Sequence, residues 1–443
     1  MQHNAPDPTA IPHLNRNVLF RLIHLLRLPV NSFVDTVPPG NFLRNRSILY
    51  NLCLTSRYLY EHATPLLYET VVFFLDDKEP SKTLAKTYGD MRHLLLLIRT
   101  LVLNPNRSPM IKNVVCPSNL AADISWPWLQ PGDVFAQRLL GVMLRLCPNV
   151  ELLLLRQPPD DWYQYLFGIL TRGTGNNSVR VVFAQLSTLC LQQLDNDDLD
   201  EIVLDVPLRL HWTQNIVRLH IWRDRGFYFF DPNFSWAQQL LELKFVGCVE
   251  ATAMYRICRE AVRLEILSLV ISGSGNRFLY PPPAERDLNH ALALRAGTLK
   301  ELEFRTCKFD WYRDQIGISE RLKCLPLLER LERLTVEIPI ISKMSRTNPG
   351  SLTFVGLPRN IISLEIVEGW PAQNRALIEK LLIEFASVDS DHLLSLRRIR
   401  YVFNTPNPTL IDLDRIGSSF DPTRLRFSYE EDNIEERYHL NQD

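Results

Sequence analysis

The sequence lacks both long apolar runs and an excess of charge of either sign. Across 443 residues no apolar stretch is longer than five residues, and Leu94–Ile98 is one such stretch. A membrane helix needs about 20 apolar residues, so the sequence predicts no membrane span. Lys and Arg total 49 while Asp and Glu total 50, which gives a formal net charge of -1. Because binders of nucleic acid or of anionic membranes usually carry a basic excess, we expect neither kind of partner.

The motifs of common enzyme and metal-binding classes are also missing. The sequence has no H-E-x-x-H, no G-x-S-x-G, no phosphate-binding loop and no G-x-G-x-x-G after a predicted strand. The 8 cysteines include no C-x-x-C pair, so we expect no zinc site, no cofactor and reduced, mostly buried thiols. The polar start Met1–His13 has no apolar stretch typical of a secretion signal. We therefore expect a non-enzymatic protein that is cytoplasmic or nuclear, and not secreted.

Leucine is the residue in excess, with 73 copies, which is one residue in six. The pattern L-x-x-L-x-L, with other aliphatic or aromatic residues allowed for Leu, recurs ten times. Its central positions are Leu101, Leu153, Leu189, Leu219, Leu243, Leu267, Leu302, Leu334, Leu364 and Ile399. Between several of these positions, apolar residues recur at helical spacing, as they do from Leu140 to Cys147.

A strand and a helix in repeated alternation predict parallel strands joined by helical crossovers. Because one such unit cannot bury its apolar face alone, neighbouring units stack into a solenoid. We therefore expect an α/β leucine-rich-repeat solenoid of about ten irregular units over residues 90–428. A doubly wound α/β sheet is the alternative, and it rarely supplies ten strands with one shared pattern. The polar, acidic stretch 429–443 is expected to be a frayed tail or a short cap.

Residues 11–75 show no such repeat and are expected to form a small all-α module. Asn15 is placed to cap a first helix. The apolar face of that helix would consist of Leu19, Leu22, Ile23 and Leu26. A second helix is expected from about Ser47 to His62, with Pro65 ending it. Short helices of this kind form a marginal core, so packing on the first repeat or on a partner would steady them.

The order of short motifs in this module is informative. The pair Ile11-Pro12 precedes an aliphatic helix, Leu-x-Leu-x-Ser-Arg follows at Leu52 to Arg57, and Pro-Leu-Leu-Tyr closes the segment at Pro65 to Tyr68. In this order the segment resembles the F-box of fungal F-box/leucine-rich-repeat proteins. The stretches CPNVELLLL and CLPLLERLERLTV also resemble the Cys-Pro repeat openings of that family.

The resemblance implies a substrate-recognition subunit of a cullin–RING (SCF-type) ubiquitin ligase. The F-box would bind a Skp-type adaptor by a helix-in-groove contact, and the repeats would bind an unknown target protein. The residues implied for adaptor binding are Pro12, Leu14, Val18, Leu19, Ile23, Leu54 and Arg57. For Leu22 and Leu52 we expect packing inside the module itself. The alternative is a non-catalytic leucine-rich-repeat scaffold whose degenerate F-box no longer binds the adaptor.

The second candidate surface is the outward face of the predicted strands. In L-x-x-L-x-L the leucines point inward, so the intervening side chains face outward. Trp222 is expected either to be an exposed binding anchor or to pack under a nearby aromatic loop. The later repeats lean acidic, which favours a basic peptide; the alternative is a solvated face of balanced charge. The candidate target-binding residues are His220, Trp222, Glu301, Glu303, Arg305, Glu337 and Glu365.

Overall fold

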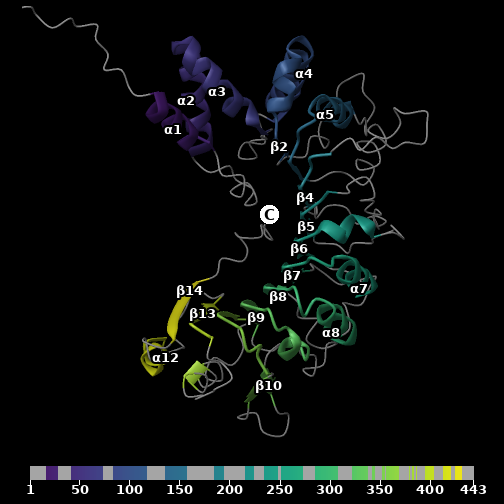
Figure 1. Ribbon diagram of the computed structural model, residues 1–443, viewed down its shortest axis with the longest axis vertical. Coiled ribbons are helices and arrows are strands. Elements are labelled where there is room, and N and C mark those ends of the chain that lie inside the picture. Colours follow the sequence, from purple (N-terminus) through teal and green to yellow (C-terminus); the bar gives the residue numbers. More distant parts are fainter. Residues whose placement is uncertain are drawn as a thin grey trace, which may run out of the picture.

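A computed structural model arranges the chain as a curved α/β structure built on one long sheet (Figure 1). The structure describes residues 16–27, 41–72, 83–116, 135–156, 184–193, 215–223, 234–247, 251–272, 285–307, 322–337, 342–344, 352–354, 356–368, 379, 382–383, 386, 395–403, 413–420 and 425–431. Within these residues, no helix combines the length and the apolar character that crossing a membrane requires.

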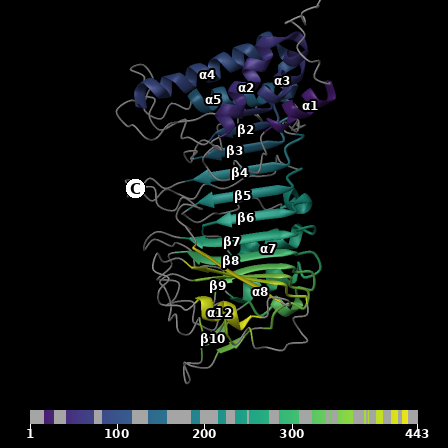
Figure 2. The same cartoon turned by 90° about the vertical axis from the view of Figure 1, so that its left-hand side faces the viewer.

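The sheet has 12 strands, in the order β1-β2-β3-β4-β5-β6-β7-β8-β9-β12-β13-β14, and every neighbouring pair is parallel (Figure 2). Its strands are β1 (Thr70–Val72), β2 (Asn113–Cys116), β3 (Leu152–Arg156), β4 (Thr188–Gln193), β5 (Arg218–Arg223), β6 (Glu242–Val246), β7 (Ile266–Ser272), β8 (Glu301–Cys307), β9 (Arg333–Glu337), β12 (Ser363–Val367), β13 (Arg398–Phe403) and β14 (Arg426–Glu431). A separate antiparallel pair, β10 (Ser342–Met344) and β11 (Leu352–Phe354), lies between β9 and β12 in the sequence.

Helices precede the sheet and alternate with its strands. The first three, α1 (Arg16–Leu25), α2 (Asn41–Thr55) and α3 (Arg57–Glu69), lie at the β1 end. The others are α4 (Thr83–Leu103), η3 (Pro105–Met110), α5 (Phe135–Leu146), η4 (Ser235–Gln239), α7 (Ala251–Glu260), α8 (Glu285–Ala293), η5 (Leu325–Leu327) and α12 (Leu413–Ser419). Helices α4, α5, α7 and α8 cover the outer face of the curved sheet, and we call its inner face the concave face (Figure 1).

The core lies between the sheet and the outer helices. Each strand contributes one apolar residue in register to a continuous row that crosses the sheet. The row is Val71, Val114, Leu153, Leu189, Leu219, Leu243, Leu267, Leu302, Leu334, Leu364, Ile399 and Phe427. Nine of the ten predicted strand centres belong to it. The chain is therefore an α/β protein with one all-parallel sheet of sequential strands, consistent with a leucine-rich-repeat-like solenoid.

The predicted strand centred on Leu101 is wrong, because that stretch is part of α4. Leu94 and Leu101 are both buried in the core from this helix. The i, i+3 spacing within L-x-x-L is also the spacing of a helix face, so the pattern cannot separate the two structures here. The strand at this position is β2 instead, where Ile111, Val114 and Cys116 fit the pattern once Cys is allowed in its last position.

The two ends of the chain also differ from the expectation. Ser56 interrupts the predicted helix from Ser47 to His62: its hydroxyl accepts a hydrogen bond from the Leu59 N–H at 3.2 Å and caps α3. Pro65 lies inside α3 and does not end it. At the other end, residues 429–431 belong to β14 and pair with β13, so for these three residues the frayed tail is wrong, whereas the alternative of a short cap is not contradicted.

Asparagines link successive units in a way that the leucine pattern did not reveal. In three units an Asn precedes the first apolar residue of the pattern and donates its side-chain N–H to a carbonyl of the previous unit. The bonds are Asn149 Nδ2 to Pro109 O (3.0 Å), Asn215 Nδ2 to Ala184 O (2.8 Å) and Asn360 Nδ2 to Glu329 O (2.5 Å).

Substituting these asparagines one at a time by Ala is expected to lower stability by about 1 kcal/mol each, the net worth of one hydrogen bond. Urea unfolding followed by far-UV circular dichroism measures the effect. Asn→Asp should weaken the same bond, because the carboxylate has no N–H to donate. An unchanged midpoint in all three Ala variants would contradict a stabilising role for this contact.

Candidate functional surfaces

The three N-terminal helices form a small core of their own. Ile23 of α1, Leu49 of α2 and Ala63 of α3 are buried together, and Leu19 and Leu52 pack against them partly buried. Ile23 and Leu19, both predicted for adaptor binding, thus contribute to the module's own packing. Cys53 adds a thiol contact to Thr64 Oγ1 at 3.6 Å.

Several apolar side chains of this module remain exposed and do not belong to its buried cluster. On α1, Val18, Leu22 and Leu25 are 45%, 49% and 76% exposed, and their i, i+4, i+7 spacing places them on one face. On α2, Tyr50 and Leu54 are 56% and 69% exposed, one helical turn apart. We call these five residues the apolar strip. Exposed apolar side chains that are grouped on a helix face are candidates for an interaction site.

The structure sorts the other residues predicted for adaptor binding. Arg57 is exposed and forms an i, i+4 ion pair with Glu61 at 3.1 Å. Leu22 is exposed, contrary to the expectation that it packs inside the module, whereas Leu52 is partly buried as expected. Pro12 and Leu14 lie outside the described residues.

The module joins the sheet without a linker, since α3 ends at Glu69 and β1 begins at Thr70. Arg27, two residues after the end of α1, donates from Nε to Glu69 at 2.9 Å, and Arg46 of α2 donates to the Thr70 carbonyl at 3.2 Å. Arg107 of η3 donates to the hydroxyls of Tyr68 and Tyr60 at 2.5 and 3.1 Å. These contacts hold the apolar strip in a set orientation relative to the sheet.

The concave face changes character along the sheet. Its central row is apolar from β1 to β4, with Val72, Val115, Leu154 and Cys190, and polar from β5 onward. Phe42 of α2 and Leu152 join the apolar part in a buried cluster, against which Trp222 packs partly buried. Trp222 is therefore a packing residue at the boundary between the two parts, and not a fully exposed anchor.

His220 begins the polar part and is buried between two neighbours. Its Nε2 lies 3.1 Å from Glu242 Oε1, and its Nδ1 lies 3.8 Å from Cys190 Sγ. Burial lowers the pKa of His220, so the ring is neutral at pH 7. Burial alone raises the pKa of Glu242, but the His220 hydrogen bond and the Lys244 charge outweigh it and lower that pKa to about 2.

Cysteine, histidine and glutamate in this order also occur in nucleophilic enzymes. Here the thiol is fully buried, and burial raises the pKa of Cys190 to about 12. A protonated, inaccessible thiol is not a nucleophile. The chain of contacts therefore stabilises the concave face and does not form a reactive centre. Among the described residues, no group of three or more His, Cys, Asp or Glu side chains could hold a metal ion.

The pKa of His220 predicts a pH dependence of stability. Below pH 6.5 the unfolded state binds a proton that the folded state excludes, so stability falls as the pH decreases from 7 to 5. The contribution of one proton is at most about 1.4 kcal/mol per pH unit. His220→Gln, which keeps an N–H donor for Glu242, should give a flatter profile of the thermal midpoint against pH. His24→Gln is the control at an exposed site; equal slopes for both variants and the parent would contradict the prediction.

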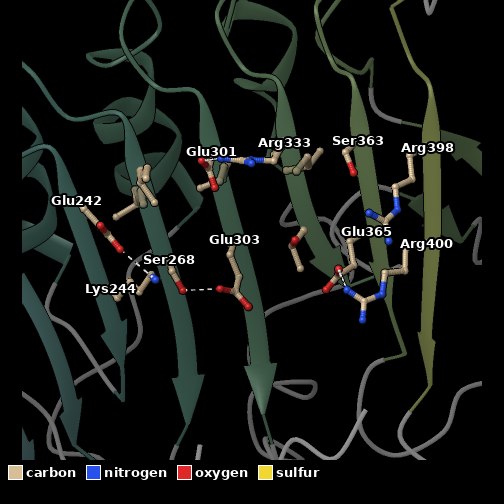
Figure 3. Close-up of a pocket in the computed structure, with 15 residues that line it drawn as sticks. Glu242, Lys244, Ser268, Glu301, Glu303, Arg333, Ser363, Glu365, Arg398 and Arg400 are labelled. Carbon is tan, nitrogen blue, oxygen red and sulfur yellow. Dashed lines mark hydrogen bonds and ion pairs between the residues drawn. The ribbon is translucent and has the colours of Figure 1, made fainter. Parts of the chain in front are cut away.

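Beyond β6 the concave face is an ordered ladder of arginines and glutamates (Figure 3). Arg305 is buried, with Nε 2.7 Å from Glu303 Oε1 and Nη2 2.9 Å from Glu365 Oε1. Arg400 Nη1 lies 3.1 Å from Glu365 Oε2, and this arginine also pairs with Glu430. Ser268 Oγ donates to Glu303 at 2.6 Å. Glu303 and Glu365 are thus paired with arginines of β8 and β13.

A hollow of about 340 Å³ lies over this ladder. Its lining residues are Glu242, Lys244, Ile266, Leu267, Ser268, Glu301, Leu302, Glu303, Arg333, Leu334, Thr335, Ser363, Glu365, Arg398 and Arg400. Of the predicted target-binding residues, Glu301, Glu303 and Glu365 line the hollow, whereas Arg305 and Glu337 are buried. The sequence left open whether this face is acidic or balanced in charge. The hollow fits the balanced alternative, because Glu301 also pairs with Arg333.

Sequence reasoning missed the arginines Arg398 and Arg400 on β13. Their alternation with Ile399 and Tyr401 was the available signal, because period-two alternation places both arginines on the concave face.

A scan against models of known protein families finds no match, and a search of curated proteins finds no matching protein either.

Proposed function

We propose that this protein is the substrate-recognition subunit of a cullin–RING (SCF-type) ubiquitin ligase and has no catalytic site of its own. In this proposal the N-terminal helices are an F-box that binds a Skp-type adaptor, and the sheet is a leucine-rich-repeat solenoid that binds a target protein. The observation that carries the proposal is the apolar strip: the helices that resemble an F-box keep apolar side chains exposed although they have a buried cluster of their own.

Two further features support this assignment. The junction of α3 and β1 sets the orientation of the strip relative to the concave face, as a receptor that presents a bound target requires. The concave face provides a hollow with polar side chains from several strands, which suits recognition of a protein segment.

The test is a pull-down of the purified full chain with a Skp-type adaptor and the cullin. The control is a Val18→Asp/Leu22→Asp variant, which alters two exposed residues and leaves the module's core intact. We expect capture of the parent chain and loss of capture of the variant. Failure of the folded parent chain to bind would overturn the ligase assignment and favour the second candidate, a non-catalytic repeat scaffold with a degenerate F-box.

A further inference from the structure

Two arginines on the concave face lie outside the ladder of ion pairs. Arg398 on β13 and Arg426 on β14 face each other in register, and both side chains are exposed. Neither side chain has an ion pair or a hydrogen bond with another residue that the structure describes.

Elsewhere on the concave face, the arginines form ion pairs with carboxylates. Arg218 lies 3.3 Å from Glu242, Arg333 pairs with Glu301, and Arg400 lies 3.1 Å from Glu365. In each case the carboxylate comes from another strand of the sheet.

The first residues of β12, β13 and β14 form a row in which arginines are no longer paired with carboxylates. These residues are Ser363, Arg398 and Arg426. Like charges in register on adjacent strands repel each other. A guanidinium stays protonated at any physiological pH, so this end of the concave face presents two positive charges that no described carboxylate contacts.

We propose that this row binds an acidic segment of a target protein, whose Asp or Glu carboxylates complete the ladder at Arg398 and Arg426. The inference rests on the proposed target-binding role of the concave face. The proposed target segment is acidic, whereas the glutamates of the later repeats favoured a basic peptide when only the sequence was considered.

The geometry suits an extended segment. Alternate side chains of an extended peptide are about 6.6 Å apart, and neighbouring strands of a sheet are about 4.8 Å apart. The flexible arginine side chains span this difference, and each guanidinium can bind one carboxylate through two parallel hydrogen bonds. Ser363 lies beside Arg398 at the edge of the hollow and offers a hydroxyl donor (Figure 3).

The test uses the purified full chain without adaptor and a fluorescent peptide of alternating Glu and Ser, followed by anisotropy. A matched peptide with Gln in place of Glu removes only the charge. We expect binding of the Glu peptide that weakens with added salt, and no binding of the Gln peptide. Arg398→Ala/Arg426→Ala should lower the affinity about tenfold or more, since hydrogen bonds to charged groups are the strong ones.

Arg397→Ala is the matched control, because this exposed arginine directly precedes the strand. It should bind as the parent chain does, and thermal midpoints should show that all variants are folded. Absence of binding by the parent chain, equal binding of the Gln peptide, or full affinity of the double variant would each overturn the proposal. So would binding confined to a phosphoserine–Gln peptide, which would assign the row to phosphate. Because the assay contains no adaptor, its result is separate from the outcome of the adaptor pull-down.

Discussion

Leu54→Asp is expected to weaken binding of a Skp-type adaptor by about 30-fold or more, the effect of removing an interface hot spot. Leu54 is 69% exposed on α2 and contributes nothing to the buried core of the module. In a complex its side chain would be desolvated, and a carboxylate there would be buried without a partner. The thermal midpoint of the free protein should stay close to that of the parent chain, because the site is solvated in the absence of a partner.

Leu327→Asp is the matched control for this prediction. Leu327 is 58% exposed in η5, far from the module in the sequence. Titration calorimetry with purified adaptor should give parent affinity for this variant. Parent affinity for both the Leu54 and the Leu327 variant would place the adaptor contact elsewhere, and an equal loss of affinity in both would indicate a general effect on folding.

Arg305→Met is expected to produce the largest loss of stability, about 3–5 kcal/mol, the range found when one partner of a buried ion pair is removed. Arg305 is 1% exposed and contacts both Glu303 and Glu365. Met fills much of the same volume, so the loss comes mainly from two carboxylates that no longer have their shared cation. The midpoint of urea unfolding is the appropriate measurement.

Arg333→Ala is the contrast, because Arg333 pairs with Glu301 but its side chain is 63% exposed. An exposed ion pair contributes about 0–1 kcal/mol. Adding Glu365→Gln to Arg305→Met should recover part of the loss, since it removes one of the two stranded charges. A small effect of Arg305→Met, similar to that of Arg333→Ala, would contradict a structural role for the buried pair.

The apolar positions of the strands were predictable because burial imposes a simple rule on them. In a parallel sheet covered by helices, every strand must present aliphatic side chains to the core at the same register. The centres from Leu153 to Ile399 obey that rule and could be read from spacing alone. The rule failed at Leu101, where the same spacing serves a helix, and at Cys116, where a thiol replaces an aliphatic side chain.

The candidate sites were less predictable because their properties depend on neighbours that are distant in sequence. Glu301, Glu303 and Glu365 indicated an acidic face only while their partners were unknown. Register brings Glu365 to Arg400, which is 35 residues away. Leu22 fitted the apolar face of a helix, yet α2 and α3 bury its neighbour Ile23 and leave Leu22 exposed.

The sequence by itself therefore determined the class of the fold, the stacking of α/β units and the position of a distinct helical segment before them. These follow from local periodicity, which depends only on residues within a few turns or strands. The tertiary structure decided which apolar side chains remain exposed, as with Leu54, and which charges have no partner within the part of the chain that the structure describes, as with Arg398. The physical reason is that burial and electrostatic pairing are set by what lies across the sheet or against the helix, and not by what is adjacent in the chain.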